Sequence, residues 1–378
     1  MRRLCSFLCI SLLLLNSCAA EIGPTPAGVG SAKALAIAGQ RAEMIDAIIR
    51  RELDERHIAG ASLAIVRDGA VLYAKGYGSA NLEEKIPARA DTRFLIASIT
   101  KMFTAVAVMI LVREAKLSLD SPIGPVTPGL PAQWQRVTVH QLLTHTSGVP
   151  SFTTFAAPPC GRRKAEADYD ANDVLDEVNC LPLDFEPGTD WRYSDTGYHL
   201  LGLIIERASG LSYEAFLERE IFRPLQMQST RLIAKPGEYD DRAVGYRWHN
   251  GAHERAPAIP LHPLVEMSTG GLASNVIDLA RFDGALANGT LVPKEVLASM
   301  WKPAGIGSAL YGMGFAVRPI NGRRQVGHTG GGPGATTSFA RFQEDGMTVI
   351  LLTNTAQPPF SVQEIIGKVA QAVLAPAG

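Results

Sequence analysis

The stretch FLIASITKMFTAVAVMILV, residues 94–112, places a serine and a lysine three residues apart at the start of a long apolar segment. From Lys101 to Val112 the pattern is apolar on almost every side, which is typical of a helix buried inside a protein. At positions i and i+3 of a helix, Ser98 and Lys101 share one face, one turn apart. The serine also lies at the helix N-terminus, where unpaired N–H groups favour a negatively charged oxygen.

This arrangement is suited to activating a hydroxyl group, because a proton acceptor lies beside it in a region of positive potential. A lysine accepts a proton only when its pKa is lowered, and burial alone would lower the pKa of Lys101 from about 10.4 to about 7 or 8. The spacing is weak evidence by itself, since Ser299 and Lys302 repeat it at a predicted helix end. The first pair therefore needs partners elsewhere in the chain.

The composition of the whole chain excludes some partners. Its 378 residues include 36 Lys and Arg against 37 Asp and Glu, and 46% are hydrophobic, which is ordinary for a globular protein with a core. The formal net charge of −1 argues against nucleic acid binding, because no overall positive field attracts a polyanion. The sequence does not indicate an oligomeric state.

Residues 1–20, MRRLCSFLCISLLLLNSCAA, indicate a signal peptide, because two arginines precede a short apolar segment and then small residues. Two interpretations stay open. One is cleavage after Ala20, and the other is lipid attachment at Cys18, since LNSC resembles the lipobox of bacterial lipoproteins. Both predict an exported, periplasmic protein, and the second adds an outer-membrane anchor, the only membrane contact that we expect. Residues 21–39 are predicted to form a linker.

Five cysteines occur in the chain, and only Cys160 and Cys180 lie beyond the predicted leader. In an oxidising compartment they are candidates for a disulfide, which would stabilise the fold by roughly 3 kcal/mol by restricting the unfolded chain. The alternative is a pair of buried free thiols.

Strand patterns occur near both ends of the chain. Near the N-terminus, ASLAIV and AVLYAKGYG flank Arg67-Asp68-Gly69, a hairpin signal. The later strand patterns are YGMGFAV (311–317), RQVGH (324–328), ATTSFARF (335–342) and MTVILLTN (347–354), with Asn321-Gly322 and Asp345-Gly346 as turns. Helical patterns at 45–53 and 362–373 enclose them.

The middle of the chain, about residues 92–300, is mostly helical pattern and loop. We therefore predict an α/β protein of the α+β type, in which an antiparallel sheet from both chain ends is flanked by the terminal helices. The middle segment would form an inserted, all-helical lobe. The whole of residues 40–375 would be a single catalytic domain.

Two later segments supply the partners that Ser98 and Lys101 need. Tyr193-Ser194-Asp195 lies on a turn before an apolar helix, and His328-Thr329-Gly330 ends a predicted strand. The three boxes, in this order, resemble the serine β-lactamase and penicillin-binding superfamily, and most of all its branch of class C β-lactamases, DD-peptidases and β-lactamase-like esterases. The boxes of that family are Ser-x-x-Lys, Tyr-x-Asn and Lys-Thr-Gly or His-Thr-Gly. With further similar stretches such as HQLLTHTSGVP (140–150), the resemblance covers about residues 40–375.

The resemblance implies a role for each box. Ser98 would be the acylated nucleophile, and Lys101 and Tyr193 would share the proton transfer. The third box (His328, Thr329 and Gly330) would line the opposite wall of the active-site cleft. The backbone N–H groups of Ser98 and Gly331 would form the oxyanion hole. The family's β-lactamase-like fold and its small-molecule or peptide substrates come with these roles, and no metal or organic cofactor is expected. His140 and His145 lack the spacing of a zinc site.

The sequence departs from the family pattern at two positions. Asp195 stands where the family usually has asparagine, and an ionised carboxylate only accepts hydrogen bonds. At about 4 Å from Lys101 it would attract the ammonium by about 4 kcal/mol, or roughly three pKa units, which cancels the effect of burial. Tyr193 then becomes the better base, although Asp195 also raises the pKa of that phenol. His328 replaces the lysine of most β-lactamases and is mostly neutral at pH 7.

The sequence thus predicts an exported serine hydrolase that cleaves an ester, amide or peptide bond through an acyl-enzyme at Ser98, of the esterase, D-amino-acid peptidase or DD-carboxypeptidase type. A class C-like β-lactamase is one alternative. A penicillin-binding sensor or scaffold that does not hydrolyse is the other, and Asp195 is the residue that favours it. Both departures weaken the case for efficient β-lactam hydrolysis.

Overall fold

The computed structural model describes residues 36–161, 172–233, 242–256, 267–356 and 361–375. The predicted signal peptide with Cys18, and most of the predicted linker, lie outside these ranges. The described residues belong to one compact unit that begins at Leu35. In these ranges, no helix has both the length and the apolar composition needed to cross a membrane.

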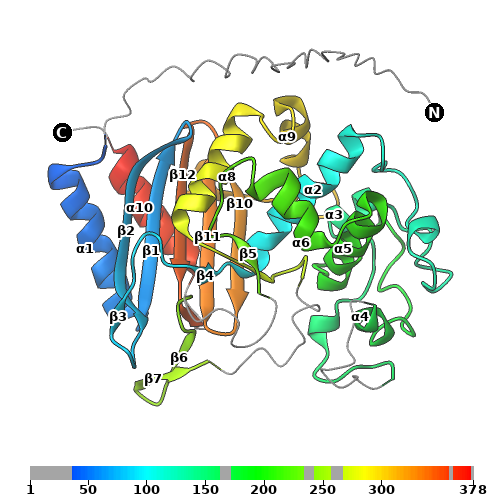
Figure 1. Cartoon of the computed structure of the whole chain (residues 1–378), viewed down its shortest axis with the longest axis horizontal. Coiled ribbons are helices and arrows are strands. Elements are labelled where there is room, and N and C mark those ends of the chain that lie inside the picture. Colours follow the sequence, from blue (N-terminus) through cyan, green and yellow to red (C-terminus); the bar gives the residue numbers. More distant parts are fainter. Residues whose placement is uncertain (1–35, 162–171, 234–241, 257–266, 357–360, 376–378) are drawn as a thin grey trace, which may run out of the picture. The chain divides into compact units, whose positions relative to one another are not determined.

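A seven-stranded antiparallel sheet joins the two ends of the chain (Figure 1). Its strand order is β3-β2-β1-β12-β11-β10-β9, so the N-terminal strand β1 pairs directly with the C-terminal strand β12. This confirms the predicted sheet. The strands are β1 (Gly60–Arg67), β2 (Ala70–Asn81), β3 (Ile86–Pro87), β9 (Ala316–Ile320), β10 (Arg323–Gly332), β11 (Ala335–Phe342) and β12 (Met347–Thr353).

Helices cover both faces of this sheet, which is why its central strands are apolar on both sides. Alternate residues of a strand point to opposite faces. Leu63 and Ile65 of β1 pack with α1 (Gly39–Glu55) and α10 (Val362–Leu374), whereas Ala64 and Val66 belong to the core that includes α8 (Val276–Asn288). Figure 1 shows α1 and α10 on one side of the sheet and α8 on the other.

Two-residue turns set the register of the hairpins, as the sequence predicts. Asp68 and Gly69 join β1 to β2 with φ angles of 49° and 81°, and Asn321 and Gly322 join β9 to β10 with 50° and 75°. Positive φ at both central residues is the type I′ geometry that matches the twist of antiparallel strands.

The segment between the two halves of the sheet carries the remaining elements. Its helices are α2 (Thr100–Arg113), α3 (Val139–Leu143), α4 (Asp173–Asp176), α5 (Asp195–Ser209), α6 (Tyr213–Leu217) and α9 (Lys294–Met300), with short helical turns η1 (Ala97–Ile99), η2 (Gly124–Val126), η3 (Phe152–Thr154) and η5 (Glu218–Phe222). Its short strands are β4 (Phe94–Leu95), β5 (Arg231–Leu232), β6 (Tyr246–His249), β7 (Ala252–Arg255) and β8 (Leu272–Ser274), and β13 (Thr355–Ala356) follows β12 and pairs with β6.

The prediction of an all-helical lobe over residues 92–300 is wrong in detail. Strands β4, β8 and β5 form a small sheet there, β6 and β7 form part of another, and α8 packs on the large sheet. Strands of two to four residues are too short to show an alternating pattern. The predicted strand at 311–317 also differs, because Gly314 has a φ of 81° and β9 begins only at Ala316.

Helix α2 is the buried helix that the opening stretch predicts. Every residue from Thr100 to Leu111 is buried, and the helix packs against α5 and α6. Ser299 and Lys302, the second Ser-x-x-Lys pair, are exposed at the end of α9. The two copies of the same spacing therefore lie in opposite environments.

Cys160 and Cys180 form a disulfide, with their Cα atoms 5.7 Å apart. The bond closes a loop that leaves η3 and returns toward the Tyr193 segment. Residues 162–171 of this loop lie outside the described ranges.

We predict that replacing both cysteines by serine lowers the free energy of unfolding. The bond spans a sequence separation of 20, and cross-links of this size restrict the unfolded chain by roughly 3 kcal/mol. Urea unfolding of the double variant beside the oxidised wild type measures the difference. Equal unfolding midpoints for the two proteins would contradict a stabilising role.

Candidate active site

The three boxes of the sequence meet where strand β10 packs against η1. Glycine at position 330 allows this contact, because a Cβ atom there would lie 2.3 Å from the carbonyl oxygen of Ile96 and 2.3 Å from Thr337 Oγ1. Helices α2 and α5 bring the other two boxes to the same place, since they pack against each other. Ser98, Lys101, Tyr193 and His328 thus lie in one cluster.

The turn that carries Ser98 is strained. Ala97 has a φ of 47°, which is uncommon for a residue with a side chain and costs on the order of 1–3 kcal/mol. Neighbouring hydrogen bonds hold this turn: the Thr337 hydroxyl donates to the carbonyl of Ile96 at 3.0 Å, and the Ile96 N–H donates to Leu272 O at 3.0 Å. Ser98 itself is half-buried.

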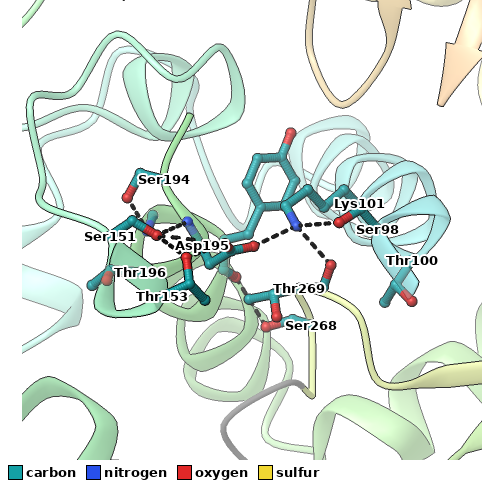
Figure 2. A network of polar contacts seen from close by, with 12 residues as sticks. Ser98, Thr100, Lys101, Ser151, Thr153, Ser194, Asp195, Thr196, Ser268 and Thr269 are labelled. Atoms are coloured by element: carbon teal, nitrogen blue, oxygen red, sulfur yellow. Dashed lines mark hydrogen bonds and ion pairs between the residues drawn. The ribbon is translucent and has the colours of Figure 1, made fainter. Parts of the chain in front are cut away.

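Lys101 is fully buried, and its amino group contacts three oxygen atoms. Nζ lies 3.2 Å from Ser98 Oγ, 2.7 Å from Asp195 Oδ1 and 2.7 Å from the carbonyl oxygen of Thr269 (Figure 2). A carboxylate and a carbonyl only accept hydrogen bonds, so two N–H groups of Lys101 are directed away from Ser98. The third position on the nitrogen, a hydrogen or a lone pair, faces the serine hydroxyl.

Electrostatics decides between these two protonation states. Burial by itself lowers the pKa of Lys101, but the adjacent Asp195 carboxylate outweighs it, and the pKa of Lys101 is raised above its ordinary value. The lysine is therefore an ammonium ion at neutral pH. This is the outcome expected for a carboxylate close to Lys101, and the lowered pKa expected from burial alone does not occur.

Tyr193 places a phenol beside this ammonium. The Lys101 nitrogen lies 4.8 Å from the centre of the Tyr193 ring. Tyr193 Oη is buried without a close hydrogen-bond partner among the described residues, although Lys101 and Ser98 are near enough to lower its pKa. Burial and the Asp195 charge act in the opposite direction and prevail, so the pKa of Tyr193 is raised. In the resting site the phenol is neutral.

His328 is buried with both ring nitrogens occupied. Nδ1 lies 2.6 Å from its neighbour's carbonyl, Thr329 O, and therefore carries the proton. Nε2 then accepts a hydrogen bond from the Tyr311 hydroxyl at 2.9 Å. Burial, with the positive charge of Lys101, lowers the pKa of His328 to about 3. The third box therefore presents a neutral ring at neutral pH.

Gly331 follows the third box on a part of β10 with one free edge. Strand β9 pairs with β10 only as far as Gly327, so residues 328–332 have no strand partner on that side within the described ranges. Gly331 is exposed, and a Cβ atom there would meet nothing within 4 Å. Its backbone is thus open to a ligand, as the predicted oxyanion position requires.

Sequence reasoning missed several residues of this cluster. His145 accepts a hydrogen bond from the Ser194 N–H at 3.1 Å through Nδ1, and burial keeps the pKa of this imidazole well below its ordinary value. It therefore positions the second box. His145 lies in HQLLTHTSGVP (140–150), a segment that resembles the family, whereas no local sequence motif marks Tyr311 or Thr269 as part of the site. No three His, Cys, Asp or Glu side chains of the described residues lie together in a way that could hold a metal ion.

The chain is similar to known proteins in sequence and in fold. The family model described as Beta-lactamase matches residues 45–374. Penicillin-binding protein 4* of Bacillus subtilis is 32% identical over 340 residues, which are 85% of this chain and 74% of that protein. Among solved structures, an octameric penicillin-binding protein homologue from Pyrococcus abyssi has a TM-score of 0.76 and 30% identity, over 88% of this chain and 77% of that one. D-amino acid amidase from Ochrobactrum anthropi SV3, complexed with D-phenylalanine, has a TM-score of 0.76 and 27% identity, over 89% and 99%.

We predict that the reactivity of Ser98 rises with pH above neutrality and that Asp195→Asn moves this rise to lower pH by at least about one unit. The raised pKa values of Lys101 and Tyr193 mean that a proton acceptor forms only in alkaline solution. Removing the carboxylate makes the ammonium less stable and the phenolate more stable, so both pKa values fall. The rate of labelling by a fluorescent phosphonate between pH 6 and 11 measures the shift. Superimposable profiles for the two proteins would show that the carboxylate does not control the acceptor.

Proposed function

The chain belongs to the beta-lactamase family, and we propose that it is a serine hydrolase that cleaves ester, amide or peptide bonds through an acyl-enzyme at Ser98. One observation carries the proposal. The Ser98 hydroxyl lies 3.2 Å from a buried lysine nitrogen, beside a phenol whose oxygen lacks a close partner among the described residues. Groups of these types, placed together, are what a weak oxygen nucleophile needs.

The reaction follows from the positions of these groups. In alkaline solution Tyr193 loses its proton to the solvent, and the phenolate, stabilised by the Lys101 ammonium, takes the Ser98 proton while Oγ forms a bond to the substrate carbonyl carbon. The backbone N–H groups of Ser98 and Gly331 receive the charge on the carbonyl oxygen. Tyr193 then returns the proton to the leaving group, whose bond to carbon breaks. Water removes the acyl group in the same way.

Tyr193 is the better proton acceptor of the two candidates, because the charge of the Asp195 carboxylate holds Lys101 as an ammonium ion. Two of its contacts, Asp195 Oδ1 and Thr269 O, are at 2.7 Å and only accept. The lysine thus supports the phenolate electrostatically, while its own proton stays in place.

The charges within the three boxes favour neutral substrates. Lys101 and Asp195 cancel each other, and His328 is a neutral ring with both nitrogens occupied. A free carboxylate on the leaving group, as in a β-lactam or a DD-peptide, would find no fixed cation in the third box. Esters and amides without that carboxylate avoid this problem, which supports the proposal of an amidase or esterase over that of an efficient β-lactamase.

We also propose that the protein is exported to an oxidising compartment. The disulfide between Cys160 and Cys180 supports this location, since such bonds persist outside the reducing cytosol. Whether Cys18 carries a lipid is tested by labelling cells with a fatty acid and comparing Cys18→Ser with the wild type.

We predict that Ser98→Ala abolishes covalent labelling by a fluorescent phosphonate and lowers turnover of p-nitrophenyl acetate by at least about 10³-fold, because the acyl group then has no attachment point. Ser299→Ala is the matched control, since it removes the exposed serine of the second Ser-x-x-Lys pair and should leave both measurements unchanged. Mass spectrometry of the labelled protein locates the adduct.

The fate of the adduct separates the alternatives. A penicillin or ester adduct that forms and disappears indicates a hydrolase, whereas an adduct that persists for hours indicates a sensor. Faster turnover of nitrocefin than of amino-acid amides and short esters would favour the β-lactamase alternative. Equal labelling of Ser98→Ala and wild type would contradict the proposed function.

A further inference from the structure

Asp195 is held on two sides by different parts of the chain. Figure 2 shows its carboxylate between Lys101 on one side and Ser151 and Thr153 on the other. Oδ1 accepts from Lys101 at 2.7 Å, and Oδ2 accepts from the Thr153 hydroxyl at 2.8 Å. Ser151 and Thr153 flank Phe152 in the turn η3, and the Phe152 N–H donates to Thr196 Oγ1 at 2.9 Å, which fixes the turn to the start of α5.

The directions of these hydrogen bonds can be assigned from the chemistry of each group. The Asp195 N–H donates to Ser151 Oγ at 2.9 Å. A hydroxyl has one proton, and the carboxylate only accepts, so Thr153 gives its proton to Oδ2. The remaining contact, 2.9 Å between the two hydroxyls, must then run from Ser151 to Thr153. Ser151 Oγ also lies 3.4 Å from Oδ2, a longer contact.

The result is a ring of hydrogen bonds in which each group donates to the next. It begins at the backbone N–H of Asp195, passes through Ser151 and Thr153, and ends on the carboxylate of the same residue. Hydrogen bonds that follow one another in this way strengthen each other. The ring requires an acceptor at Oδ2, just as Lys101 requires an acceptor at Oδ1.

An ionised carboxylate satisfies both requirements with every hydroxyl in the direction just assigned. An asparagine side chain has one accepting oxygen, and its other atom is an N–H donor. With that oxygen toward Thr153, its amide N–H groups would face the Lys101 ammonium; with the oxygen toward Lys101, they would face the donating hydroxyl. The hydroxyl groups of Ser151 and Thr153 therefore suit an aspartate at position 195, where the family usually has asparagine.

We propose that Ser151 and Thr153 are positioning residues for catalysis, which hold Asp195 with one carboxylate oxygen on Lys101 and so keep the lysine charged beside Ser98. Neither residue needs to touch the substrate. The kinetic test of this inference rests on the proposed function, because it measures turnover. The orientation of the Asp195 side chain in a variant structure tests the inference without it.

We predict that Thr153→Val lowers kcat on the alkaline plateau, where the proton acceptor has already formed, by about 5- to 20-fold with little change in KM, since a hydrogen bond to a charged group is lost and no substrate contact is removed. Thr153→Ser keeps the hydroxyl and should restore most of the rate. In the Asp195→Asn background the same Thr153→Val change should alter kcat by less than about twofold, because the ring no longer has a carboxylate to hold. Thr189→Val is the control, since its exposed hydroxyl donates to the backbone of Glu186.

A crystal structure of Thr153→Val gives the readout that does not depend on activity. We expect the Asp195 carboxylate to rotate away from its position on Lys101 or to occupy two orientations. An unmoved carboxylate, an equal loss of kcat in the aspartate and asparagine backgrounds, or no rescue by serine would each overturn the proposal. Absence of any Ser98 labelling in the wild type would instead contradict the proposed function, and the crystal structure would still decide the positioning role.

Discussion

The ion pair between Lys101 and Asp195 is the interaction on which the rest of the site depends. Lys101 is fully buried, and without a counter-charge it would lose its proton. The carboxylate at 2.7 Å reverses that balance and makes the lysine a fixed positive charge beside the serine hydroxyl. The remaining chemistry then passes to the phenol, which has no competing close partner among the described residues.

The fold places this pair at a junction of distant segments. Lys101 lies on α2, Asp195 opens α5, and the hydroxyls that hold the carboxylate come from the turn η3 and from Ser151, the residue before it. The sheet contributes strand β10, which approaches the nucleophile closely because residue 330 is a glycine. A large buried core around α2 and α5 keeps these segments in register, so the charges cannot relax apart at low cost.

Much of this arrangement could be predicted from the sequence. The buried helix and the type I′ turns follow from local patterns, and the sheet from both chain ends follows from the order of those patterns. The prediction of a carboxylate close to Lys101 needed only the family's box order and the Asp195 substitution. The short strands β4, β5 and β8 could not be predicted, because two or three residues carry no periodicity. Tyr311 was also missed, since nothing in the local sequence indicates its contact with His328. Thr153 was missed because Ser-x-Thr is an ordinary turn sequence and its partner, Asp195, lies 42 residues further along the chain.

The protonation state of Lys101 tests the central claim most directly. Neutron diffraction from deuterium-exchanged crystals at neutral pH would locate the deuterons on Nζ. We expect three, directed at Asp195 Oδ1, Thr269 O and Ser98 Oγ. Two deuterons, with the nitrogen lone pair facing the serine, would show a neutral amine and contradict the account, because Lys101 itself would then be the base.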